Sequence, residues 1–177
     1  TPSITGTLAF EALDIHSVFS GFMPLPDGSA DSDTVIDSGF LKQLNLDLRV
    51  STQKATIGTI DLSKVAATAQ IRNGRAMFDI GEASAFDGSV AASFQLADEG
   101  DGATTGELRL RGTDVNSASI ASLLGFGDRF QLGKGTMSLV LKGPISRWST
   151  ALGNAKGTLS MRFGSGQIRS LDFNGLL

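Results

Sequence analysis

The sequence predicts a mostly β fold, in which a repeated antiparallel strand meander forms a curved sheet accompanied by a few short helices. Three observations lead to this prediction: apolar and polar residues alternate over several segments, 22 of the 177 residues are glycine, and helical periodicity is rare. Successive side chains of a strand point to opposite faces, so such alternation predicts one apolar and one polar face. The sheet could form an open β-groove or part of an open sandwich.

The composition limits the class of protein. A chain of 177 residues without cysteine has no disulfides, thiolate metal sites or thiol nucleophiles, yet is long enough to bury a core. The net charge of -3, spread over mixed signs, argues against nucleic acid as a partner. No run of about twenty apolar residues is present, so membrane association would need segments outside this sequence.

Alternating segments recur along the chain. In residues 44–50, leucine and valine occupy one face, while Asn45, Asp47 and Arg49 occupy the other. The same pattern predicts strands at 90–96, 107–111, 136–142 and 158–163.

Turn signals separate these strands. Asn73-Gly74 is the strongest hairpin signal, because both residues tolerate positive φ. Asp87-Gly88 predicts a second hairpin of the same kind, and Gly164-Ser165-Gly166 predicts a looser one. The turns and the alternation together predict the strand meander.

Three short helices are predicted from apolar stripes. The first, at 15–22, has Asp14 as its N-cap and Pro24 as its stop. The second stripe, at 120–124, follows Asp114, and the third lies at 145–152. A polar, acidic loop is predicted at 24–38 and a smaller loop at 98–105.

These elements recur in the same order, which predicts two diverged repeat units within one domain. Residues 5–97 form the first β-helix-β unit and 106–177 the second, with the loop at 98–105 as the joint. The second unit lacks its last strand, so we expect the natural protein to continue beyond Leu177.

The order of motifs resembles the C-terminal region of the AsmA family of bacterial envelope proteins. The resemblance is carried by LDLRV at 46–50, IGTI at 57–60, AQIRNG at 69–74, FDGSV at 86–90, GTMSL at 135–139, NAKGTL at 154–159 and GQIRSLD at 166–172. It covers nearly the whole chain from Thr5, and the order of the motifs carries more weight than any one of them. Ser165 stands where the family's "NGTL…DGxIxGLD" theme favours Asp.

The resemblance implies a periplasmic body, an anchor in the bacterial inner membrane upstream, and a role in outer-membrane biogenesis. Relatives form long β-grooves that conduct phospholipid between membranes. The family brings no catalytic residue and no cofactor, so we expect a protein that is not an enzyme. The leading hypothesis is therefore a module that binds or conducts phospholipid along an apolar sheet face. The alternative is a structural module that contacts envelope proteins through its sheet edges and assists outer-membrane protein assembly.

An apolar sheet face is either covered as an ordinary core or left open for acyl chains. An open face could hold lipid without specific polar contacts, because each buried methylene contributes about 0.8 kcal/mol. The candidate lipid-contacting residues are Leu44, Leu46, Leu48, Met137, Leu139 and Leu141.

Other chemistry has little support. His16 is the only histidine, and a hydrolase built on it would need a nucleophile turn such as G-x-S-x-G, which the sequence lacks. We expect His16 to be a solvated residue of the first helix turn. The aspartates at 27, 31, 33 and 37 could attract a divalent cation, but their spacing does not match a calcium loop. We therefore expect no catalytic residue and no metal site.

Overall fold

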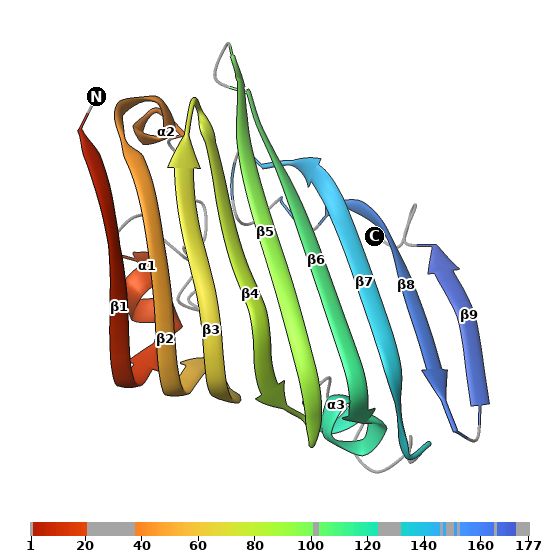
Figure 1. Ribbon diagram of the computed structural model, residues 1–177. Coiled ribbons are helices and arrows are strands. Elements are labelled where there is room, and N and C mark those ends of the chain that lie inside the picture. The colour runs from red at the N-terminus through yellow and green to blue at the C-terminus, as the bar shows by residue number, and fades with distance from the viewer. Residues whose placement is uncertain are drawn as a thin grey trace.

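The computed structural model of the chain contains one open, curved sheet of nine strands, whose spatial order is the order of the sequence (Figure 1). The structure describes residues 2–20, 38–100, 103–123, 132–145, 147, 151, 153–164 and 166–172. The strands are β1 (Ser3–Asp14), β2 (Asn45–Ile57), β3 (Ile60–Arg72), β4 (Arg75–Ala85), β5 (Gly88–Gly100), β6 (Ala103–Asn116), β7 (Lys134–Pro144), β8 (Lys156–Phe163) and β9 (Gly166–Asp172). Short helices are α1 (Ile15–Ser20), α2 (Phe40–Gln43) and α3 (Ser117–Leu123). The prediction of a mostly β fold with few, short helices is confirmed.

The first pair of strands departs from the predicted antiparallel meander. β1 and β2 run parallel, whereas every later pair of neighbours is antiparallel. The chain leaves the end of β1 through α1 and returns to the start of β1, where the N–H of Asn45 donates to the carbonyl of Pro2 at 2.9 Å. Parallel neighbours require such a crossover. The corresponding segment of the second proposed unit consists of β6, α3 and β7, and its two strands are antiparallel.

The hairpin predicted at Asn73-Gly74 is confirmed. These residues have φ values of 52° and 75° and connect the paired residues Arg72 and Arg75. Positive φ at both central positions gives the turn a twist that matches the twist of the strands.

The next turn lies one residue earlier than predicted. Phe86 and Asp87 are the turn residues, with φ values of 53° and 59°, and Ala85 pairs with Gly88. Gly88 serves a different purpose, because a Cβ there would lie 2.5 Å from the carbonyl oxygen of Thr113. The glycine thus permits β6 to approach closely, and does not itself form the turn.

Two helices begin with side-chain caps. Asp14 caps α1 as predicted, since its Oδ1 accepts the N–H of His16 at 3.1 Å. Asn116 caps α3, because its Oδ1 accepts the N–H of Ala118 at 3.0 Å. Asp114, which the sequence places before this helix, has a φ of 54° within β6.

Other loop and helix predictions have mixed outcomes. The loop predicted at 98–105 is shorter, because β5 extends to Gly100 and β6 begins at Ala103. α2 was not predicted, since a helix of four residues has no periodic stripe. The acidic loop at 24–38 and the third predicted helix at 145–152 lie mostly outside the described residues. None of the described helices is both long and apolar enough to cross a membrane.

Candidate functional site

One face of the sheet, which we call the apolar face, carries apolar side chains from β1 to β8. Its central row consists of residues placed opposite one another on successive strands: Leu8, Val50, Ala67, Ile80, Ala92, Leu110, Leu139 and Leu159. A neighbouring row consists of Gly6, Leu48, Ala69, Phe78, Phe94, Leu108, Leu141 and Gly157. The alternation seen in single strands is therefore kept in register across the sheet.

The register brings the candidate lipid-contacting residues of β2 and β7 to this one face. Leu46 lies opposite Ile71, and Leu48 and Leu141 belong to the same row. Leu139 lies in the central row and Met137 in the row beyond it. Leu44, just before β2, packs against the same cluster as Leu46.

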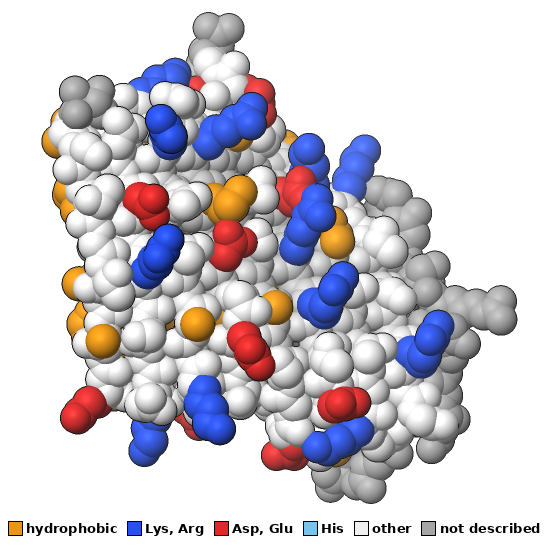
Figure 2. All heavy atoms as spheres, viewed as in Figure 1, with side chains coloured by type: hydrophobic (Ala, Val, Ile, Leu, Met, Phe, Trp, Pro, Cys, Tyr) orange, Lys and Arg blue, Asp and Glu red, His pale blue; other side chains and the backbone are white. Residues whose placement is uncertain are grey.

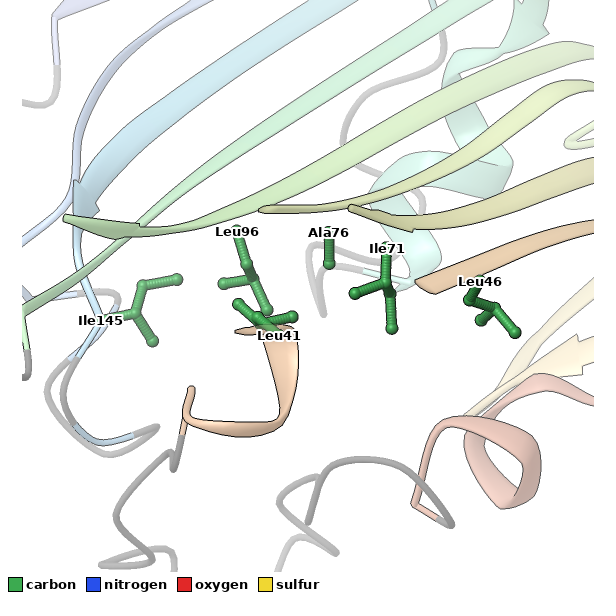
Figure 3. Packing of buried hydrophobic residues seen from close by; sticks show 6 residues of the cluster. All are labelled: Leu41, Leu46, Ile71, Ala76, Leu96 and Ile145. Carbon is green, nitrogen blue, oxygen red and sulfur yellow. The ribbon is translucent and has the colours of Figure 1, made fainter. Parts of the chain in front are cut away.

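α2 covers the apolar face at the end where β2 begins (Figure 3). Leu41 of α2 is completely buried and faces a row in which Leu46 and Ile71 are 6% and 1% exposed. The carbonyl of Leu41 accepts the N–H of Gly74 at 3.1 Å, which ties the helix to the β3–β4 hairpin. Leu46 is therefore part of a packed core and not of an accessible surface.

An ion pair holds α2 to β5 as well. Nζ of Lys42 lies 2.9 Å from Oδ2 of Asp98, whose side chain is only 6% exposed. Two groups hold the pKa of Asp98 below its usual value. The larger effect comes from the Lys42 ammonium, and the smaller from the Gly100 N–H, which donates to Oδ1 of Asp98 at 2.8 Å. The carboxylate is therefore charged at neutral pH, and its ion pair links α2 to β5.

The opposite end of the apolar face is covered by the two other helices. Ile15 of α1 packs against a buried cluster that includes Ala55 and Val65. Ile120 of α3 is buried with Val115 and Phe163 in another cluster. In the described part of the chain, the two ends of the sheet thus have separate small cores, in place of one core along the whole face.

Between the covered ends, β6–β8 present five leucines that are only half-buried and that belong to none of the clusters formed by the described residues. This leucine patch consists of Leu108, Leu110, Leu139, Leu141 and Leu159. At the other end of the central row, the edge strand β1 exposes Leu8 by 42% and Phe10 by 39%. A partly accessible apolar path therefore runs across the strands.

The six candidates thus differ in accessibility. Leu46 is buried in the cluster that includes Leu41 of α2, whereas Leu44, Leu48 and Met137 border the buried clusters. Leu139 and Leu141 belong to the leucine patch. Reasoning from the sequence missed Leu108, Leu110 and Leu159, although the alternation that places Leu139 on this face occurs in their strands too.

The other face is polar, and Figure 2 shows lysine, arginine, aspartate and glutamate side chains distributed over it. Pairs on the polar face alternate along the strands with pairs on the apolar face. For example, the pair Arg109–Val140 lies between the pairs Leu108–Leu141 and Leu110–Leu139. Faces of such different polarity on one sheet confine any apolar ligand to one side.

His16 lies in a helix cap. The hydroxyl of Ser17 donates to Oδ2 of Asp14 at 2.5 Å, and this hydrogen bond is the main reason that the pKa of Asp14 is lowered. The backbone N–H of His16 donates to the same carboxylate. Among the described residues, no group of three acidic or histidine side chains could hold a metal ion, and the aspartates at 27–37 lie outside them.

No protein-family model, curated protein or solved structure matches this chain.

Proposed function

We propose that this chain is a periplasmic module that binds or conducts phospholipid along its apolar face and so supports outer-membrane assembly. The observation that carries the proposal is the partly accessible central row, with the leucine patch at its β6–β8 end. The resemblance of the motif order to the AsmA family supports the same reading, and suggests attachment to the bacterial inner membrane through other segments. The proposed activity is binding without catalysis or a cofactor.

The dimensions of the central row suit an acyl chain. Eight strands about 4.8 Å apart give the row a length of about 34 Å. The hydrocarbon core of a bilayer, which contains two layers of acyl chains, is about 30 Å thick. One acyl chain, lying across the strands, therefore fits within the row with length to spare.

The energetics favour exchange over tight capture. Each methylene that leaves water contributes about 0.8 kcal/mol, but a lipid that comes from a bilayer leaves one apolar environment for another. The leucine patch therefore mainly offsets the cost of leaving the membrane. Because the free energy of the lipid then differs little between the bilayer and the apolar face, the lipid can be both loaded and released, as conduction requires.

A second candidate function is supported by the edge of the sheet. β1 extends over 12 residues and, in the described part of the chain, pairs only with β2. Ile4, Leu8 and Phe10 on this strand are 49%, 42% and 39% exposed. Long edge strands with exposed apolar residues are templates for pairing, which suits a structural module that assists outer-membrane protein assembly.

The test of the proposed function is native mass spectrometry of protein purified from bacterial membranes in mild detergent. We expect a population of the protein to carry a mass equal to that of a phospholipid, and this population to disappear after organic extraction and return on incubation with phospholipid vesicles. Protein that carries no phospholipid before or after such incubation would contradict lipid binding. Envelope proteins retained by that lipid-free chain would instead favour the edge-pairing candidate.

A further inference from the structure

The polar face of β6–β8 concentrates positive charge. Five basic side chains on these three adjacent strands are exposed and share this face, and we call them the basic patch: Arg109, Arg111, Lys142, Lys156 and Arg162. The register places Lys142 opposite Lys156, and Arg162 opposite Thr136. Figure 2 shows the corresponding group of lysine and arginine side chains over these strands.

Acidic side chains do not balance this charge. Among the described side chains, β6–β8 carry only two acidic residues, Glu107 and Asp114, and Glu107 already forms ion pairs with Arg109 and, at 3.9 Å, with Lys142. The strands therefore carry a local excess of positive charge, in a chain whose net charge is -3. On β2–β4, by contrast, the polar face carries both signs: Asp47 lies on the same strand as Arg49, and Asp79 lies in the same row across the strands.

The shape of the basic patch fits an extended partner better than a single ion. Its residues lie in rows across three strands and along seven residues of β7 (136–142), which corresponds to about 10 Å by 20 Å. The residues between them are short: Ser138 and Ser160 lie beside Arg111, and Val140 and Thr158 beside Arg109. The charged groups therefore project from a flat surface that does not enclose a small ligand.

We propose that the basic patch binds the headgroups of an anionic bilayer surface, so that the polar face of β6–β8 lies against the membrane. Several cations on a flat surface match a plane of phosphate charges, and exposed lysine and arginine residues near such a plane each add to the attraction. The leucine patch occupies the opposite face of the same strands, so the protein docks without inserting it. This docking does not depend on the proposed lipid binding.

Flotation with vesicles tests the docking. The vesicles contain either phosphatidylcholine alone or phosphatidylcholine with phosphatidylglycerol, at low salt and at 0.5 M salt. We expect the intact protein to partition at least ten-fold more strongly onto the anionic vesicles at low salt, and high salt to remove most of this preference. Equal partitioning onto both vesicle types, or binding that salt does not weaken, would overturn the proposal.

A matched pair of triple variants locates the contact. Arg111→Gln, Lys156→Gln and Arg162→Gln remove exposed charges from the basic patch, whereas Arg49→Gln, Arg72→Gln and Arg75→Gln remove the same charge from β2–β4. We expect the first variant to lose at least ten-fold in partitioning onto anionic vesicles and the second to change less than two-fold, with unchanged circular dichroism in both. Equal losses in the two variants would overturn the assignment of membrane docking to the basic patch. The assignment would also be overturned if the intact protein bound an acidic protein but no vesicles. Both variants keep the leucine patch, so failure of docking is distinguishable from failure of acyl-chain binding.

Discussion

Leu46→Glu is expected to destabilise the domain by about 3–5 kcal/mol, the loss typical of a buried charge without a partner. Leu46 is 6% exposed and belongs, with Leu41, Ile71 and Ala76, to one buried cluster. A carboxylate at this position either remains charged in an apolar cluster or forces the cluster apart, and both outcomes cost free energy. Urea denaturation followed by circular dichroism measures the loss, and the pure protein without lipid suffices.

Ser51→Glu is the matched control, because Ser51 is an exposed residue of the same strand. This change adds the same carboxylate outside the core, so we expect an effect within about 0.5 kcal/mol. A Leu46→Glu protein that unfolds at the same urea concentration as the control would show that Leu46 does not lie in a packed core.

Leu139→Glu is expected to reduce phospholipid binding strongly and to reduce the stability of the domain only slightly. Leu139 lies in the central row, is half-buried and packs in none of the clusters of described residues. Its carboxylate can reach water, so we expect a loss of stability of about 1 kcal/mol, the centre of the range for single substitutions. Bound phospholipid, measured by native mass spectrometry, should nevertheless fall at least ten-fold, because an acyl chain would have to pass a hydrated charge.

Val140→Glu provides the control for this second experiment. Val140 is the next residue along β7, points to the polar face and is 39% exposed. We expect this variant to retain its phospholipid. If Leu139→Glu unfolds as readily as Leu46→Glu, the central row is a closed core. If it folds normally and keeps its phospholipid, Leu139 lies off the lipid path.

Local sequence patterns predicted which residues share a face. Alternation in residues 44–50 and 136–142 placed Leu48 and Leu141 on apolar faces of their strands, and the register of the sheet joins those faces into one. This worked because the side-chain period of a strand is a local property. The hairpin at Asn73-Gly74 was predictable for the same reason, since its two turn residues determine its geometry.

Long-range contacts were beyond such patterns. The parallel pairing of β1 with β2 depends on a crossover, and nothing in the alternation of β1 specifies the direction of its neighbour. The turn at Phe86-Asp87 was misplaced by one residue, because Gly88 is required by the nearby backbone of Thr113 and not by the turn. The cluster that buries Leu46 includes Leu41 of α2, a helix too short to leave a periodic signal.

The position of a bound acyl chain shows directly whether lipid lies along the apolar face. A phospholipid with a photoreactive diazirine in one acyl chain can be bound to the protein, crosslinked by light, and its attachment sites identified by mass spectrometry of peptides. We predict attachment along the central row, at Leu110, Leu139 and Leu159, which lie side by side on β6, β7 and β8. Attachment mainly to Val140 and Thr158 on the polar face, or no attachment above that of a denatured sample, would show that acyl chains do not bind along the central row.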